Sequence, residues 1–260
     1  MIYSKLRRMK VKISVVIITL NEERDIKRCL DSVQSIADEI VVVDSFSTDK
    51  TKEICESYSV KFIENRFEGH IQQKNFAKNQ AKYDYVLSLD ADEALSEELI
   101  ASIITVKQNW ENVGGYYVSR LTNYCDKWIK HCGWYPDTKL RLFKKNHGQW
   151  AGTNPHDRYE VNNDKQTKML NGDLLHYSYY SIRQHIDQVN YFTDILAKEQ
   201  YNTKKGSILS IIIKPFIKFI KDYWIKLGFL DGYYGFVVCS ISSFATFIKY
   251  AKIRQIQKSK

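Results

Sequence analysis

Between residues 13 and 109, short apolar runs alternate with segments whose apolar residues recur at helical spacing. The run Ile13–Ile18 is rich in β-branched residues and has the unbroken apolar character of a strand that is buried on both faces. The predicted strands are 13–18, 40–43, 60–63 and 85–89, and the predicted helices are 22–35, 69–82 and 96–109. This alternation predicts an α/β fold with a parallel, doubly wound sheet.

The fourth predicted strand ends in two carboxylates spaced i, i+2, Asp90 and Asp92. Alternation along an extended strand end places both on the same side. Two carboxylates there suit Mg²⁺ or Mn²⁺ carrying a phosphate, and ligands of an open α/β sheet bind beyond the carboxyl ends of its strands. The same residues also fit a solvated turn before a helix, with Asp92 and Glu93 in the favourable first turn.

Past Gly114-Gly115 the strand–helix rhythm changes. Strands are predicted at 115–120 and 139–143, with an aromatic, loop-like segment at 128–137 between them and a helix from 181 to about 201. We therefore expect an α/β half over 1–112, a less regular half over 113–206, and a C-terminal helical tail over 207–260. The tail is expected to be basic and amphipathic.

The formal net charge of +9 lies entirely in the last sixty residues. Residues 201–260 hold eleven Lys or Arg against two acidic residues, Asp222 and Asp231. Because residues 1–200 are balanced, a nucleic-acid partner is disfavoured. Lysines interleaved with aromatic and aliphatic residues favour an anionic membrane surface as the partner of residues 207–260.

The uncharged run 232–248 is about as long as the shortest transmembrane helices. Its residues could span a membrane, lie on it, or form an ordinary C-terminal pair of packed helices. The leader Met1–Lys12 is short, basic and without an apolar core, and the five cysteines are scattered. These features favour a cytoplasmic protein with reduced thiols, peripherally associated with the inner face of the cell membrane.

Several motifs in order along the chain resemble family 2 glycosyltransferases, the inverting enzymes of the GT-A fold. The shared motifs are Thr19-Leu20-Asn21-Glu22-Glu23, Asp44, Gln72-Gln73-Lys74-Asn75, Asp90-Ala91-Asp92, Trp134-Tyr135-Pro136-Asp137, Arg141-Leu142-Phe143 and Pro155-His156-Asp157. The segment Gly228–Gly235 is also similar to the lipopolysaccharide-core β-glucosyltransferase subgroup. The resemblance implies a Rossmann-like, mostly parallel sheet and a nucleotide-sugar donor. It also implies that residues 1–112 bind the nucleotide sugar and that residues 113–206 hold the acceptor and the catalytic base.

The resemblance also implies roles for the residues near the first two strand ends. Thr19, Asn21 and Glu22 would hold the uracil and ribose of a UDP-sugar, although helix capping explains the same residues. Asp44 would accept hydrogen bonds from the base or ribose, with a capping turn as the alternative. Asp90 would face the ribose and donor sugar.

A second group of residues would hold the metal and the phosphates. Asp92 would bind the Mn²⁺ or Mg²⁺ ion that bridges the diphosphate, which assists departure of the leaving group. His176 resembles a further metal ligand of some GT-A enzymes, and a core histidine is the alternative. Lys74 and Arg141 would contact the sugar or phosphates, or else form surface ion pairs.

An inverting transfer needs one base to accept the proton of the attacking hydroxyl group. The family places an acidic residue after a histidine there, commonly glutamate, and Asp157 after His156 occupies that place. Asp157 is therefore the candidate base, although its side chain is one methylene shorter than glutamate. A loop carboxylate paired with Arg158 is the alternative.

The combined prediction is a metal-dependent glycosyltransferase that moves a sugar, with glucose as the subgroup's suggestion, from UDP to a lipid-linked saccharide such as the lipopolysaccharide inner core. One alternative is a nucleotidyltransferase, but Thr19 to Arg24 lacks the glycine-rich loop that class uses. The other is a non-catalytic, membrane-associated scaffold with the same fold. That scaffold would be favoured by the loss of Asp92 or Asp157, and both residues are present.

Overall fold

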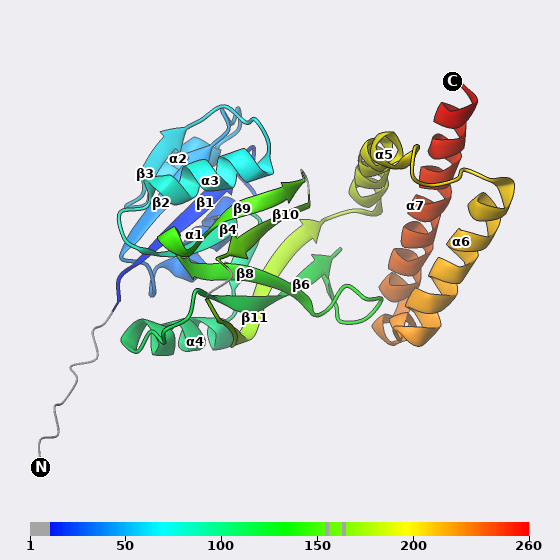
Figure 1. Cartoon of the computed structure of the whole chain (residues 1–260). Coiled ribbons are helices and arrows are strands. Elements are labelled where there is room, and N and C mark those ends of the chain that lie inside the picture. The colour runs from blue at the N-terminus through cyan, green and yellow to red at the C-terminus, as the bar shows by residue number, and fades with distance from the viewer. Residues whose placement is uncertain (1–10, 154–155, 163–164, 260) are drawn as a thin grey trace, which may run out of the picture. The chain divides into compact units, whose positions relative to one another are not determined.

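The computed structural model describes residues 11–153, 156–162 and 165–259 (Figure 1). Most of the basic leader and Pro155 of the Pro-His-Asp motif therefore lie outside the described residues. The chain forms two compact units, here called unit 1 (residues 1–120 and 137–176) and unit 2 (residues 121–136 and 177–260). The expected functional divisions near 112 and 206 remain predictions.

Unit 1 begins with the expected parallel sheet. Its strands are β1 (Ile13–Thr19), β2 (Glu39–Asp44), β3 (Lys61–Glu64) and β4 (Tyr85–Asp90), in the spatial order β3-β2-β1-β4. All seven residues of β1 are buried, as a central strand covered on both faces requires. The helices are α1 (Ile26–Val33), α2 (Thr51–Glu56), α3 (His70–Gln80) and α4 (Glu97–Gln108). This confirms the predicted mixed α/β fold.

The sheet continues past β4 with antiparallel strands. They are β8 (Asp137–Lys144), β6 (Gly115–Tyr124), β11 (Thr167–Tyr179) and β5 (Glu93–Leu95), in that order. β5 is a buried three-residue strand paired with β11, so Glu93 is not in the first turn of a helix. Ser96 is the N-cap residue of the next helix, α4, and its hydroxyl accepts a hydrogen bond from the Leu99 amide.

A two-stranded hairpin adds to unit 1. It consists of β9 (Gly148–Thr153) and β10 (His156–Val161), preceded by the 3₁₀ turn η1 (Lys145–His147). The ring of Tyr159 stacks on Phe143 of β8 at 3.6 Å between centroids, and Trp150 lies edge-on to both. This aromatic cluster fixes the hairpin, and with it Asp157, to the sheet.

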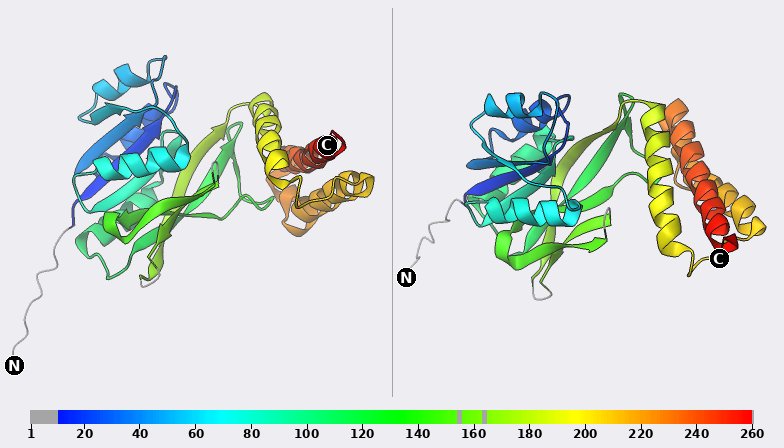
Figure 2. Two further views of the ribbon diagram at one scale, coloured as in Figure 1. Left: turned by 45° about the horizontal axis from the view of Figure 1, so that its top comes forward. Right: turned by 90° about the horizontal axis from the view of Figure 1, so that it is seen from above.

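Unit 2 is mainly helical (Figure 2). It contains β7 (Lys127–Ile129), α5 (Ile182–Gln200), α6 (Ile208–Ile220), the π-helical turn η2 (Lys221–Ile225), the 3₁₀ turn η3 (Gly228–Asp231) and α7 (Gly232–Lys258). α7 packs against both α5 and α6. Within the described chain, 228–258 is the one helical segment long and apolar enough to cross a membrane by length and composition, and 28% of its most apolar window is buried inside the protein.

Gly235 explains part of the tail motif in steric terms. A Cβ atom at Gly235 would lie 1.9 Å from the carbonyl oxygen of Gly228, so the two backbones approach too closely for a side chain. Asp231, between them, accepts hydrogen bonds from the backbone of Lys130 and His131 and from the ring of His131. The motif thus joins η3, the start of α7 and the segment 130–131.

Candidate functional site

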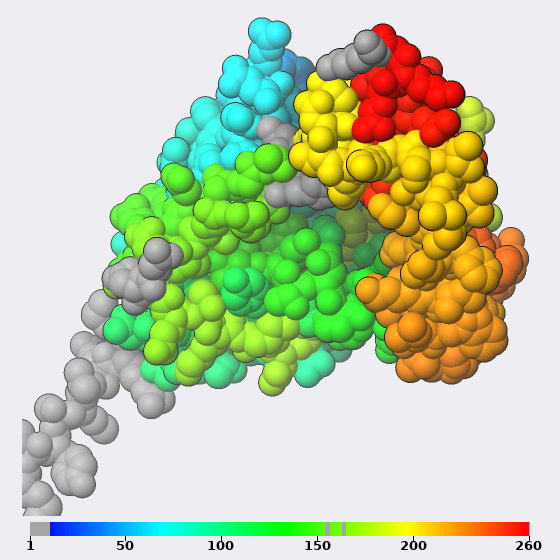
Figure 3. Space-filling view, turned by 45° about the vertical axis from the view of Figure 1, so that its right-hand side comes forward, coloured from blue at the N-terminus to red at the C-terminus, as the bar shows by residue number. Residues whose placement is uncertain are grey.

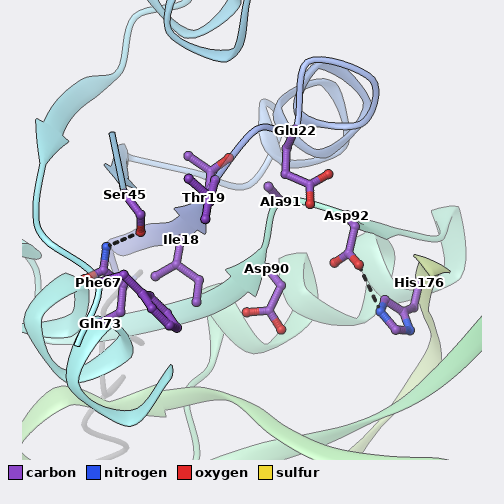
Figure 4. Close-up of a pocket in the computed structure, with 11 residues that line it drawn as sticks. Ile18, Thr19, Glu22, Ser45, Phe67, Gln73, Asp90, Ala91, Asp92 and His176 are labelled. Carbon is purple, nitrogen blue, oxygen red and sulfur yellow. Dashed lines mark hydrogen bonds and ion pairs between the residues drawn. The ribbon is translucent and has the colours of Figure 1, made fainter. Parts of the chain in front are cut away.

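The candidate site is a cavity of about 210 Å³ in unit 1, at the carboxyl ends of β1 and β4. Figure 4 shows Glu22, Asp90, Asp92 and His176 around the same space. The lining residues are Ile18, Thr19, Leu20, Glu22, Ser45, Phe67, Gln73, Asp90, Ala91, Asp92 and His176. The position is the one at which open α/β sheets bind their ligands.

The loops after β1 and β2 are fastened to each other. Asn21, in a left-handed conformation with a φ of 54°, accepts a hydrogen bond from the Thr48 amide at 2.8 Å. The amide of Asn21 donates to the Ser47 hydroxyl, and the amide of Glu22 donates to the Thr51 hydroxyl. In this structure Asn21 therefore serves to hold the two loops together.

Asp44 is buried at the end of β2 and belongs to a capping turn. Its carboxylate accepts hydrogen bonds from the amide and the hydroxyl of Ser47 at 2.7 and 2.5 Å. Within the described chain, the residue that lines the cavity at this point is Ser45 rather than Asp44. A contact between Asp44 and a nucleotide remains a prediction.

One polar atom at the cavity fits a polar ligand. Among the described residues, Thr19 Oγ1 is buried and makes no hydrogen bond. A buried polar atom is nearly always hydrogen-bonded, so a ligand or water is the expected partner. Burial, with a further contribution from Asp92, raises the pKa of Glu22 to about 8. Glu22 is therefore mostly protonated at neutral pH and can donate a hydrogen bond into the cavity.

Lys74 links the two halves of the predicted site. Its ammonium nitrogen lies 3.0 Å from Asp90 Oδ1 and 2.9 Å from Asp157 Oδ2. The side chain of Lys74 is only 4% exposed, and its charge lies 4.8 Å from the centre of the Trp150 ring. The alternative partner of Asp157, Arg158, instead lies 2.5 Å from Glu160. Lys74 is thus a buried bridge rather than a surface ion-pair partner.

Arg141 is the second cation beside Asp90. It lies 2.9 Å from Asp90 Oδ2 and 2.6 Å from Glu93 Oε1, and it is 5.7 Å from the Trp150 ring centre. Burial alone would raise the pKa of Asp90, but the charges of Lys74 and Arg141 outweigh it and hold that pKa well below its usual range. Asp90 is therefore ionised at every pH at which the protein is expected to work.

Asp92 and His176 form the second predicted pair. His176 Nε2, on β11, lies 3.1 Å from Asp92 Oδ2 (Figure 4). In the described chain no group of three or more His, Cys, Asp or Glu side chains is arranged to hold a metal. One carboxylate and one imidazole fit a divalent ion that completes its coordination with water and substrate phosphates, as Mg²⁺ and Mn²⁺ do.

The structure brings together most of the residues singled out from the sequence. Around the cavity it places Thr19, Glu22, Asp90, Asp92 and His176. Lys74, Arg141 and Asp157 meet Asp90 through the ion pairs above. The roles of these residues in binding and catalysis remain predictions.

Three further participants were not assigned roles from the sequence. Glu93 is fully buried and holds Arg141, and its other oxygen accepts a hydrogen bond from the Asp90 amide. Trp150 faces both cations, and Gln73 donates to the Ser45 hydroxyl. The sequence carried one signal for Glu93, because this charged residue begins the short run Glu93-Ala94-Leu95, which is otherwise apolar. A charged side chain in such a run needs a partner, and the ion pair with Arg141 provides one.

A family model described as Glycosyl transferase family 2 matches residues 14–163, which run from the second residue of β1 past the end of β10. The matched residues include every candidate site residue except His176. The chain belongs to glycosyl transferase family 2. This family 2 glycosyltransferase is 35% identical over 255 residues to an uncharacterized glycosyltransferase of Rickettsia bellii (strain RML369-C), covering 94% of this chain and 87% of that protein. Membership of this family identifies the protein as an enzyme. It supports neither the nucleotidyltransferase alternative nor the alternative of a non-catalytic scaffold.

A second relative of this family 2 glycosyltransferase has a more specific name. The lipopolysaccharide core biosynthesis glycosyltransferase LpsC of Rhizobium meliloti (strain 1021) is 26% identical over 257 residues, covering 95% of this chain and 93% of LpsC. The similarity therefore includes the helices of unit 2 as well as the sheet.

Among solved structures, glucosyl-3-phosphoglycerate synthase from Mycobacterium tuberculosis, in complex with Mn²⁺, uridine diphosphate and phosphoglyceric acid, is similar to part of the chain. The sequence identity is 21% and the TM-score is 0.36. The match covers 44% of this chain and 43% of that chain, less than half of either.

Proposed function

We propose that this family 2 glycosyltransferase transfers a sugar, with inversion, from a UDP-sugar to a lipid-linked saccharide, with Asp157 as the base. The observation that carries the proposal is the bridge formed by Lys74 between Asp90 and Asp157. The ammonium group of Lys74 thus contacts two carboxylates. One lies at the donor cavity, and the other comes from the β9–β10 hairpin.

In the proposed reaction the acceptor hydroxyl group attacks the anomeric carbon while the bond from that carbon to the UDP oxygen breaks. Asp157 accepts the hydroxyl proton, and the electron pair of the broken bond leaves with UDP. Lys74 orients Asp157 and, with Arg141, places positive charge near the donor phosphates. Trp150 covers both cations, which limits their access to water.

Asp92 and His176 would hold the Mn²⁺ or Mg²⁺ ion. When bound, this ion would offset the charge that develops on the departing diphosphate. Thr19 and Glu22 would meet the nucleoside, because both line the cavity and the Thr19 hydroxyl has no hydrogen-bond partner within the described residues.

The acceptor class is supported by LpsC, whose name places it in lipopolysaccharide core biosynthesis and which is similar along nearly the whole chain. Glucose as the donor sugar rests on the motif resemblance of residues 228–235. We therefore propose UDP-glucose as the first donor to test and an inner-core saccharide as the acceptor.

The surface of α6, drawn in yellow to orange in Figure 3, is largely apolar, which supports association with the membrane. Seven of its large hydrophobic residues are exposed by 36–67%: Ile208, Leu209, Ile212, Ile213, Phe216, Ile217 and Ile220. An apolar helix face of this length, with lysines beside it, is typical of a surface that lies in the membrane interface.

The binding half of the proposal is tested by calorimetric titration of the full chain with UDP and UDP-glucose, with Mn²⁺ and then with EDTA. We expect binding with the metal and a loss of about tenfold or more in affinity for Asp92→Ala, because the site loses a charged ligand. Asp84→Ala is the matched control, since it removes a carboxylate just before the other end of β4. Equal affinities in all three proteins, with and without metal, would contradict the proposal.

The membrane half is tested with full-length protein and vesicles containing anionic lipid. Truncation of 207–260 is unsuitable because α7 contributes Val238 and Cys239 to the core of unit 2. Phe216→Glu should reduce flotation with the vesicles, whereas Met169→Glu, at an exposed position of β11, should not. Equal flotation of the two variants would refute membrane contact through α6.

A further inference from the structure

Unit 2 contains a groove to which none of the expected roles applies. Its volume is about 310 Å³, and it is formed by residues of α5 and α7, together with Tyr179 and with Lys218 of α6. Figure 2 shows α5 and α6 flanking α7. The lining residues are Tyr179, His185, Gln188, Val189, Phe192, Thr193, Leu196, Lys218, Ser242, Ala245, Thr246 and Lys249.

The polar groups along the walls are mostly occupied within the protein. Thr246 Oγ1 donates to the Ser242 carbonyl at 3.2 Å, and Thr193 Oγ1 donates to the Asn190 carbonyl at 3.0 Å. Gln188 Oε1 accepts a hydrogen bond from the Tyr179 hydroxyl. These groups place little demand on a ligand, so the groove suits a hydrocarbon chain.

The two lysines that line the groove differ in whether a carboxylate pairs with them. Lys218 forms an ion pair with Asp222, whereas Lys249 has no carboxylate partner among the described residues. Lys249 is half-buried, and burial together with the charge of Lys204 lowers its pKa. The charges of Lys214 and Lys218 also lower the pKa of Lys249. A half-buried ammonium group among other lysines is stabilised by an anion.

We propose that this groove binds one acyl chain of an anionic phospholipid, with the lipid phosphate against Lys249. Val189, Phe192, Leu196 and Ala245 would contact the chain, and Lys218 would add a second positive charge near the phosphate. The volume lies near the lower limit of roughly 300–1,000 Å³ for ligand pockets, which fits a single chain better than a bulky glycolipid. This inference deepens the proposed membrane association, because it adds a specific lipid site to the apolar face of α6.

The test uses the full chain and decyl phosphate below its critical micelle concentration, titrated by calorimetry. Decyl maltoside carries an alkyl chain without charge, and inorganic phosphate carries the charge without a chain. Decyl phosphate should bind once per chain, about tenfold tighter than decyl maltoside and about a hundredfold tighter than inorganic phosphate. Equal affinity for decyl phosphate and decyl maltoside would overturn the role of Lys249, and equal affinity for the two phosphates would overturn the chain site.

Variants locate the binding. Ala245→Phe fills the groove and should abolish binding, and Lys249→Gln should weaken it about tenfold. Lys258→Gln removes the same charge from the exposed end of α7 and should change the affinity by less than about twofold. Because Lys249 is half-exposed, Lys249→Gln tests the proposal even where Ala245→Phe fails to fold. Binding that is unchanged in Lys249→Gln, or in folded Ala245→Phe, would assign the ligand to another surface and overturn the proposal.

The outcome is independent of the flotation assay. Monomeric decyl phosphate presents no bilayer, so the exposed face of α6 has no membrane to enter. Loss of groove binding with normal flotation would overturn the lipid site alone. Intact groove binding that depends on Lys249, with flotation unchanged by Phe216→Glu, would support the lipid site and refute membrane contact through α6.

Discussion

Asp157 accepts a hydrogen bond of 2.9 Å from Lys74, a residue 83 positions earlier in the chain. The same ammonium group lies 3.0 Å from Asp90 at the end of β4. Because α3, β4 and β10 each contribute one member, the three charges meet only when the sheet and the β9–β10 hairpin are both in place. The candidate donor cavity and the candidate base are therefore coupled through a single buried cation.

Removing that cation should destabilise the protein and abolish catalysis. Lys74→Met leaves Asp90 and Asp157 without their shared partner, which should lower the free energy of unfolding by about 3 kcal/mol. In the double variant with Asp157→Asn, about 1 kcal/mol or more of that loss should return, because one uncompensated charge is gone. Urea unfolding of the four proteins of this cycle is the measurement, and strictly additive effects would contradict the coupling.

Glu93 should matter through Arg141. Glu93→Gln replaces one carboxylate oxygen with an amide group, so either the Arg141 contact at 2.6 Å or the Asp90 amide contact at 2.9 Å loses its acceptor. We expect a loss of about 1.5–3 kcal/mol in stability, as for hydrogen bonds to charged groups. Exposed Glu68→Gln should stay within about 0.5 kcal/mol of the parent in the same urea experiment. If the two variants are equally stable, Glu93 does not hold Arg141 in solution.

The parallel half of the fold could be predicted from the sequence because its signals are local. Buried strands such as Ile13–Ile18 are unbroken β-branched runs, and Ser96 is an N-cap residue directly before a helical pattern. The Gly148–Val161 hairpin carries no such signal, since its position depends on the stacking of Tyr159 on Phe143 across the sheet. β5 is likewise only three residues long and exists through its pairing with β11.

The same distinction holds at the site. Asp90 and Asp92 could be selected because they directly follow a predicted buried strand. The pairing of Lys74 with Asp157, the burial of Glu93 and the position of Trp150 depend on distant contacts, which a single sequence does not show. The capping turn at Asp44 is a local contact of a kind that the sequence could suggest, because the Ser47 amide three residues later donates to its carboxylate. The contact of Asp44 with a nucleotide stays a prediction.

Acidification should destabilise the protein through His185. Burial among Tyr124, Trp134 and Tyr179 lowers the pKa of His185 to about 4, against 6.5 for the free side chain. Between these pH values the unfolded chain binds a proton that the folded chain does not, so stability is fully present above pH 6.5 and falls as the pH falls towards 4. The expected loss from pH 7 to pH 5 is about 2 kcal/mol.

His185→Gln provides the control for this pH effect. The amide side chain does not titrate, so the variant should lose about 2 kcal/mol less stability than the parent over the same pH interval. Urea unfolding of both proteins at pH 7 and pH 5 gives the two differences. An identical loss in both proteins would assign the acid sensitivity to other groups.

Gly235→Ala should disturb the contact of η3 with α7. The added methyl group would lie 1.9 Å from the Gly228 carbonyl oxygen, and such overpacking costs about 1–3 kcal/mol. Ser240→Ala, further along the same helix, should change stability by less than about 0.5 kcal/mol. Thermal unfolding of the two variants is sufficient, and a Gly235→Ala protein as stable as its parent would show that the backbone approach is not required.

The assignment of Asp157 as the base is tested by UDP release from UDP-glucose, with Mn²⁺ or Mg²⁺ and an inner-core saccharide acceptor. The parent protein, Asp157→Asn and Glu160→Gln are compared. Glu160 lies on the same strand and is exposed, so Glu160→Gln serves as the matched control. We expect Asp157→Asn to lower kcat by about 10²–10⁴-fold, the usual contribution of a general base, while its affinity for UDP-glucose stays within about twofold of the parent value. Glu160→Gln should retain parental turnover. Parental turnover by Asp157→Asn would contradict the assignment of the base.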